Sequence, residues 1–255
     1  MWPDLASPFV IAHRGDKAYT PENTLSSFNQ AAEKGADAVE FDVKLSADGQ
    51  VIVLHDQTVD RTTNGKGNAA KLPLEMLREL EAGVQFPGQF NGERIPTLDE
   101  VFETIGKRIY MNVELTNYST SNDELVPKVV ELVIKHGLQS RVLFSSFLAR
   151  NLQKTRLLLP KVPRALLTLP GLMGLWGRTI GWRGDYAALN PFLMDLNTGL
   201  VDRVHSAGKR IIVWTVTAEV DINRMISLGV DGIITDDPAL VLRLLGRAKE
   251  TQRRP

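Results

Sequence analysis

Carboxylates and an imidazole lie close together in the stretch from Val39 to His55. Glu40 and Asp42 are one residue apart in a run of β-branched and aromatic residues that predicts a strand. Side chains alternate between the faces of a strand, so both carboxylates point the same way, with Cα atoms about 6.6 Å apart. One divalent cation could therefore bridge the two of them.

A hairpin is expected to bring His55 to this acidic pair. Asp48-Gly49 is typical of a two-residue turn, and such a turn pairs Asp42 with His55. Carboxylate oxygens without cysteine favour a hard ion, Mg²⁺ or Ca²⁺, over zinc. An exposed acidic strand is the alternative interpretation of the E-x-D pattern alone.

Short β-branched segments alternate with longer segments of helical period, which predicts a parallel sheet built from βα units. The expected strands cover residues 9–13, 38–43, 109–114, 142–145, 164–167, 187–190, 211–215 and 232–235. The expected helices cover residues 24–34, 98–105, 124–136, 149–159, 200–207, 219–228 and 238 to about 249, and a fifth in the order, around 172–180, is indistinct.

The polar residues of these strands distinguish a barrel from a doubly wound sheet. His13, Asp42, Glu114 and Trp214 lie at or near the C-terminal ends of their strands, where TIM barrels carry their chemistry. A doubly wound sheet would concentrate its site at one switch point, usually with a glycine-rich phosphate loop, and no such motif is present. We therefore expect an α/β protein, a TIM (β/α)8 barrel with a small insertion after the second strand.

Length and composition fit one domain that spans residues 1–255. The segment of about 40 residues at 57–96 interrupts the βα rhythm, and we expect it to form a subdomain that acts either as a lid or as a brace for the hairpin. Lys plus Arg and Asp plus Glu both number 30, so no net field attracts nucleic acid. Without cysteine, a signal-like start or a long apolar run, a cytoplasmic location is expected.

The chain resembles the glycerophosphodiester phosphodiesterase family from about Phe9 to Pro238. The motifs that carry the resemblance are I11-A-H-R-G15, P21-E-N-T24, E40-F-D42, H55-D56, D60-R-T-T-N-G65, I95-P-T-L98, W214-T-V216 and V230-D-G-I-I-T-D236. The resemblance implies a TIM barrel that hydrolyses glycerophosphodiesters to sn-glycerol 3-phosphate and an alcohol, with one divalent metal, Mg²⁺ or Ca²⁺, and two histidines.

Glu40, Asp42 and Glu114 match the metal ligands of this family, although Glu114 alone could also be a helix cap at the end of a strand. His13 and His55 are the acid and base candidates, because imidazole titrates near neutral pH. By similarity to the related barrel phospholipases, His13 is expected to be the base and His55 the acid, and the reverse order is left open.

Other positions match the substrate-binding residues of the family. Arg14 corresponds to its phosphate-binding arginine, whose planar fork suits phosphate oxygens. Glu22 and Asn23 are expected to support Arg14 or the first histidine, or to open a helix. Trp214 is expected to form an apolar wall for the glycerol, or to be part of the core.

The chain departs from the family after the third expected strand. Family members commonly have E-x-K there, with the lysine at the phosphate, whereas this chain has E114-L-T116. Thr116 can donate a hydrogen bond but carries no charge. Lys44 shares the expected face of Glu40 and Asp42, so it is the candidate to replace the missing cation.

Four functions compete at this stage. The main one is metal-dependent hydrolysis of a small-molecule glycerophosphodiester, and the alternative is a lysophospholipase D with the same residues. A catalytically inactive barrel used for binding would not need both histidines and three carboxylates. A glycosidase with paired carboxylates would leave the histidines unexplained. The head group of the substrate, the choice of metal and the oligomeric state are left open.

Residues 166–182, here called the apolar segment, follow the fifth expected strand and contain Trp176 and Trp182. The segment is too short and too interrupted by Gly and Pro to span a bilayer, yet it is apolar for a surface loop. We expect either a helix folded onto the barrel or a surface that contacts lipid or a membrane, where both tryptophans would suit the boundary.

Overall fold

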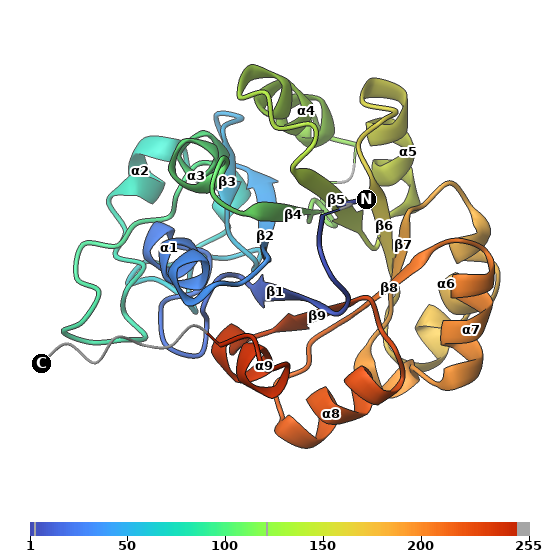
Figure 1. The fold of residues 1–255 in the computed structure, drawn as a ribbon. Coiled ribbons are helices and arrows are strands. Elements are labelled where there is room, and N and C mark those ends of the chain that lie inside the picture. Colours follow the sequence, from blue (N-terminus) through green and yellow to red (C-terminus); the bar gives the residue numbers. More distant parts are fainter. Residues whose placement is uncertain (3, 121, 249–255) are drawn as a thin grey trace, which may run out of the picture.

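The computed structural model describes residues 1–2, 4–120 and 122–248. Within these residues, eight parallel strands form a closed barrel, because the order β1-β9-β8-β7-β6-β5-β4-β2 returns to β1 (Figure 1). The strands are β1 (Phe9–His13), β2 (Ala38–Leu45), β4 (Tyr110–Leu115), β5 (Val142–Ser146), β6 (Arg164–Leu167), β7 (Ala188–Asn190), β8 (Arg210–Val213) and β9 (Gly232–Thr235). The predicted TIM barrel is confirmed.

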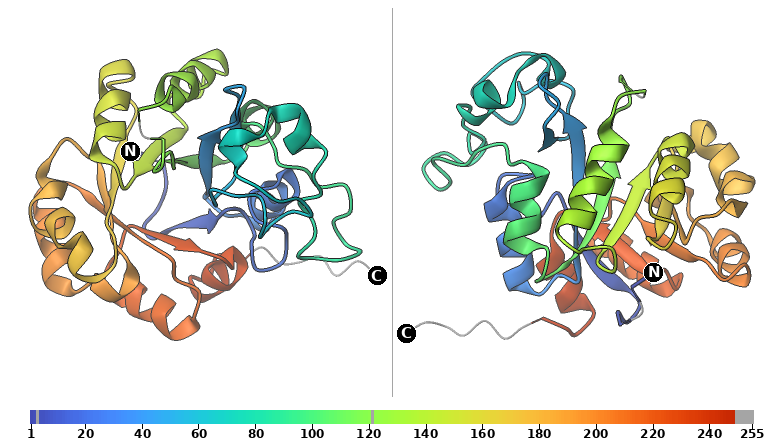
Figure 2. Two further views of the ribbon diagram at one scale, coloured as in Figure 1. Left: turned by 180° about the vertical axis from the view of Figure 1, so that it is seen from behind. Right: turned by 90° about the horizontal axis from the view of Figure 1, so that it is seen from above.

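Helices cover the outside of the barrel in both views of Figure 2. They are α1 (Leu25–Lys34), α3 (Leu98–Ile105), α4 (Leu125–Lys135), α5 (Ala149–Leu158), α6 (Leu175–Thr179), α7 (Thr198–Ser206), α8 (Glu219–Ser227) and α9 (Pro238–Leu244). The last helix ends at Leu244, whereas we expected it to run to about Lys249, which lies outside the described residues. In the part of the chain that is described, no helix has the length and apolar character needed to cross a bilayer.

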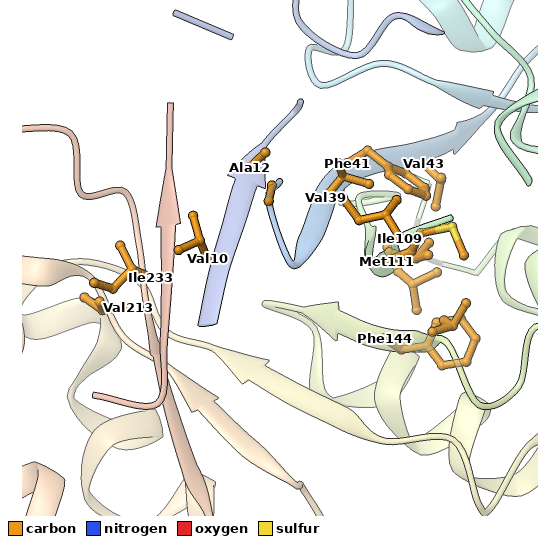
Figure 3. Close-up of a cluster of buried hydrophobic side chains, with 14 of the residues drawn as sticks. Val10, Ala12, Val39, Phe41, Val43, Ile109, Met111, Phe144, Val213 and Ile233 are labelled. Atoms are coloured by element: carbon orange, nitrogen blue, oxygen red, sulfur yellow. The ribbon is translucent and has the colours of Figure 1, made fainter. Parts of the chain in front are cut away.

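The alternation of side chains along β2 creates both the core and the site. Val39, Phe41 and Val43 belong to the hydrophobic cluster between the strands and the helices, part of which is drawn in Figure 3. Glu40 and Asp42, the intervening residues, therefore point to the interior of the barrel. Apolar residues fill the rest of that interior, namely Phe9, Ile11, Ala38, Leu143, Ala165, Ala188, Ile212 and Ile234.

The hairpin after β2 differs from the prediction by one residue. The antiparallel strand β3 (Val51–Val53) is in a register that places Leu54 opposite Asp42, with the Leu54 N–H donating to the Asp42 carbonyl at 3.0 Å. The expected pairing of Asp42 with His55 is wrong. The turn holds three residues, 47–49, and Gly49 has a φ of 75°, the left-handed value that such a loop requires.

Residues 57–96 form a small unit beyond β3. The unit contains the 3-10 helix η1 (Ala69–Lys71) and α2 (Leu74–Arg78), and Figure 2 (right) shows this teal segment at one end of the barrel, away from the N-terminus. Arg78 ties it to α3 through a bidentate pair with Glu100. A separate hydrophobic cluster lies beneath it, made of Ile52, Leu54, Val59, Ala69, Leu77, Ala82 and Ile95.

Gly15 gives a direct test of the turn that leaves β1. Its φ is 87°, and a Cβ there would lie 1.9 Å from the Ser27 hydroxyl oxygen. Gly15→Ala should lower the free energy of unfolding by at least about 2 kcal/mol, because backbone strain and steric overlap add. Gly137→Ala is the matched control, since its φ is 67° and no atom lies within 4 Å. Equal losses in chemical denaturation would contradict the packing argument.

Candidate active site

Three carboxylates meet at the C-terminal ends of β2 and β4. Glu40, Asp42 and Glu114 each offer an oxygen, and these oxygens lie within 4.8 Å of one another. The register between the strands explains the meeting, because Asp42 is directly opposite Glu114. Glu40 and Asp42 are only 3% and 1% exposed. We call these three residues the acidic cluster.

The charges of the acidic cluster are only partly compensated. Burial, followed by repulsion from Asp42, raises the pKa of Glu114 to about 8. Burial and the other two carboxylates raise the pKa of Glu40 well above its usual value. Burial also opposes the charge of Asp42, but the adjacent Arg14 outweighs it and holds that pKa low. Converging oxygens with excess negative charge fit a hard divalent cation, so the cluster is able to bind one.

Arg14 is held against the acidic cluster by its backbone and its side chain. Its φ is 56°, and its N–H donates to both the carbonyl and the carboxylate of Glu40, at 2.8 and 3.2 Å. Its guanidinium donates to Glu22 at 2.9 Å and lies 3.2 Å from Asp42. Asn23, with a φ of 57°, donates to Asp42 at 3.0 Å. Glu22 and Asn23 therefore contact the residues that they were expected to support.

His13 is oriented by a carboxylate from the opposite end of the chain. Its Nδ1 lies 2.6 Å from Asp236 Oδ1, and its Nε2 lies 4.0 Å from a Glu40 oxygen. Burial lowers the pKa of His13, although the hydrogen bond to Asp236 opposes that effect. A neutral imidazole that donates from Nδ1 keeps Nε2 free of a proton, as a base requires.

His55 lies on the loop after β3 and has its own carboxylate partner. Its Nδ1 is 2.6 Å from Asp56 Oδ1. The Arg61 guanidinium donates to Asp56 and also forms a bidentate pair with Glu22, with N–O distances of 2.7 and 2.8 Å. Burial opposes ionisation of Glu22, but Arg61 and Arg14 lower its pKa to about 2. One chain of ion pairs thus links His55 to Arg14.

Both histidines and part of the acidic cluster line one cavity of about 200 Å³. Its polar wall consists of His13, Arg14, Glu40, His55, Asn112 and Glu114, and its other wall includes Phe147, Leu167, Trp214 and Ile234. The indole N–H of Trp214 donates to a backbone carbonyl, and its ring packs edge-on against Phe147 at 5.5 Å. Polar chemistry and an apolar surface therefore face each other across the cavity.

Two expected substrate contacts lie outside this cavity. Lys44 is 5% exposed and donates to the carbonyls of His55 and Asp56 at 2.7 and 2.6 Å. Burial lowers its pKa to about 8. Thr116 is buried and donates to the Val43 carbonyl at 2.9 Å. A substrate contact by either residue stays a prediction, and the observed contacts favour a supporting role for Lys44.

Several partners of the site had no assigned role in the sequence analysis. Asp56, Arg61 and Asp236 occur inside the quoted motifs, so their presence was visible and their pairing was not. Tyr118, which donates to Glu114 at 2.5 Å, belongs to none of those motifs. An aspartate that follows a candidate histidine directly, as in H55-D56, is the one local signal that could have been used.

The raised pKa of Glu114 predicts that protons and cation compete. Without a cation, this group stabilises the fold below about pH 4.5, and the contribution is lost as pH rises to about 8. Cation affinity should increase about tenfold per pH unit for each proton displaced. Calorimetry between pH 6 and 8 in buffers of different ionisation enthalpy measures both the affinity and the protons released.

Glu114→Gln provides the control in chelator. The difference in unfolding free energy between the parent and this variant should move in favour of the variant as pH rises from 5 to 8, a window set by the Glu114 pKa of about 8. A difference that stays constant with pH, or an affinity that does not depend on pH, would contradict the competition.

Comparisons with known proteins agree with this geometry. The model of the "Glycerophosphoryl diester phosphodiesterase family" matches residues 13–240. A glycerophosphodiester phosphodiesterase of Caldanaerobacter subterraneus is 40% identical over 237 residues, which cover 92% of this chain and 97% of that protein. One of Bacillus altitudinis is 33% identical, with 92% and 97% covered.

Solved structures give the same result. An Oleispira antarctica phosphodiesterase in complex with the product sn-glycerol-3-phosphate has a TM-score of 0.86 and 31% identity, with 94% of this chain and 97% of that chain covered. A putative glycerophosphoryl diester phosphodiesterase of Silicibacter pomeroyi has a TM-score of 0.84 and 27% identity, with 94% and 93% covered. The chain therefore belongs to the glycerophosphoryl diester phosphodiesterase family and is a phosphoric diester hydrolase.

Proposed function

We propose that this chain hydrolyses glycerophosphodiesters to sn-glycerol 3-phosphate and an alcohol, using one divalent cation, Mg²⁺ or Ca²⁺, and two histidines. The observation that carries the proposal is the convergence of three carboxylates within 4.8 Å beside a cavity that two aspartate-paired histidines also line. The residues act in one domain, 1–255, with residues 57–96 inserted, and a cytoplasmic location stays a prediction.

Each residue has a defined task in this proposal. Glu40, Asp42 and Glu114 hold the cation, which when bound neutralises charge on the phosphodiester. Arg14 binds a phosphate oxygen through its fixed guanidinium. His13, oriented by Asp236, takes a proton from the attacking oxygen, and His55 protonates the departing alcohol. The apolar wall around Trp214 receives the carbon side of the glycerol.

Removal of the cation and of each histidine tests the assignment. Chelator should abolish hydrolysis of glycerophosphocholine, and His13→Ala and His55→Ala should each lower kcat by about 10² to 10⁴. A nitrophenyl diester has a leaving group that needs no acid, so it should rescue His55→Ala and leave His13→Ala impaired. Full activity in chelator would overturn the proposal, and equal rescue of both variants would overturn the roles.

The same substrates separate two roles of the insertion. Arg61→Lys breaks the fork to Glu22 and Asp56, so His55 loses its orientation, and activity on glycerophosphocholine should fall about 10- to 100-fold. The loss should be smaller on the nitrophenyl diester. Arg78→Lys breaks a comparable fork in the same unit and should affect both substrates alike. A uniform loss in Arg61→Lys would mean that the insertion acts as a brace alone.

The apolar segment favours a second candidate, the lysophospholipase D. The segment emerges beside the site, because an apolar groove of about 90 Å³ along it shares Phe147 and Leu167 with the catalytic cavity. Leu172, Met173 and Trp176 are 88%, 77% and 57% exposed, respectively. Such exposure suits contact with an acyl chain or a lipid surface.

The shape of the segment is actively maintained. Arg178, only 9% exposed, donates to the carbonyls of Leu169 and Gly171 and pairs with Asp195 at 3.1 Å. The prediction for Trp182 is wrong, because this residue is 4% exposed and packs in the core. Since the 3-10 helix η2 (Gly171–Gly174) and α6 carry the exposed residues, the segment is only in part a helix folded onto the barrel.

A matched pair of substrates tests this candidate. Leu172→Ser with Met173→Ser should reduce kcat/KM for an acyl lysophosphatidylcholine about tenfold or more and spare glycerophosphocholine, because the two differ only in the acyl chain. Leu157→Ser with Leu158→Ser is the control, since these residues are 83% and 47% exposed at the end of α5. Equal losses on both substrates would argue against a lipid substrate.

A further inference from the structure

Asn112 on β4 is a buried amide that the contacts described so far do not use. It is 1% exposed, and within the described residues neither its Oδ1 nor its Nδ2 has a hydrogen-bond partner. More than about 90% of buried polar groups are paired, and leaving one unpaired costs about 1–3 kcal/mol. An amide kept at that cost, on the wall of a cavity, has both atoms available to a ligand.

The sheet register places Asn112 within the acidic cluster. Asn112 is directly opposite Glu40 on β2, and adjacent strands lie about 4.8 Å apart. Glu114 is two residues further along β4, so it shares the face of Asn112. Asn112, Glu40 and Glu114 all line the cavity. The amide therefore borders two of the three carboxylates.

The chemistry of the amide fits what the carboxylates lack. Ca²⁺ takes six to eight oxygen ligands in a flexible geometry and accepts amide carbonyls, whereas Mg²⁺ keeps several waters. Three carboxylates supply too few oxygens for Ca²⁺ unless each one chelates or other groups join. A neutral carbonyl adds an oxygen without adding a fourth negative charge to a buried group of three.

We propose that Asn112 Oδ1 is a fourth protein ligand of the cation site and that it favours Ca²⁺ over Mg²⁺. This inference rests on the proposed cation site at Glu40, Asp42 and Glu114. It assigns Asn112 to the cation and leaves the acid and base roles of the histidines unchanged.

Calorimetric titration with Ca²⁺ and with Mg²⁺ tests the assignment on parent and variant. Asn112→Leu has nearly the same size and no oxygen, so the Kd for Ca²⁺ should rise at least about tenfold and the Kd for Mg²⁺ should rise less. The melting temperature in chelator should be unchanged or higher, because an unpaired buried amide has been removed. Asn112→Ala gives the same comparison if the leucine variant does not fold.

Asn190→Leu is the control for the loss of a buried amide. Asn190 is 0% exposed on β7, its side-chain atoms are also unpaired among the described residues, and it does not line the catalytic cavity. Its Ca²⁺ affinity should equal that of the parent. A parent-like Kd in both Asn112 variants overturns the inference and leaves the cation site intact. A parent that binds no cation at all would instead overturn the cation site proposed for the reaction.

Discussion

Crowding of like charge is the constraint around which this structure is built. Three carboxylates in a buried space of less than 5 Å repel one another, and none of them has bulk water to screen its charge. Arg14 relieves part of the repulsion through Asp42, and the left-handed backbone at Arg14 and Asn23 holds both side chains where they do so. The remaining charge makes the cluster a receptor for a cation.

A second layer of charge surrounds this centre and orders the histidines. Each imidazole has an aspartate at Nδ1, so each presents Nε2 as its other functional nitrogen. The two pairs have different supports, because Asp236 follows β9 whereas Asp56 is held by Arg61 from the insertion. The insertion therefore contacts the machinery through one guanidinium, and its hydrophobic cluster serves to hold that guanidinium in place.

The cavity also separates two kinds of surface. Charged groups occupy the wall formed by β1, β2 and β4, while aromatic and aliphatic residues from later strands and loops occupy the facing wall. Phe147 stands between Tyr118, which contacts Glu114, and Trp214, in a series of edge-on aromatic contacts. A phosphodiester, which is charged at one end and carbon-rich at the other, matches this division.

Local sequence determined what depends on local periodicity. Alternation along β2 predicted that Glu40 and Asp42 share a face, and the βα rhythm predicted the barrel and the strand ends where the site lies. Tertiary structure decided what depends on long-range contact. The pairing of His13 with Asp236 spans 223 residues and exists only because the barrel closes β1 against β9.

The errors of the prediction have the same physical origin. Lys44 was placed on the correct face by alternation, but a hairpin loop of three residues shifted the register and brought the loop carbonyls of His55 and Asp56 to its ammonium group. Trp182 became core and Trp176 stayed exposed because the fold of the segment, held by Arg178, set which ring faces the barrel. Residue type and spacing therefore determined the chemistry available to this protein, and closure of the barrel decided which groups meet to perform it.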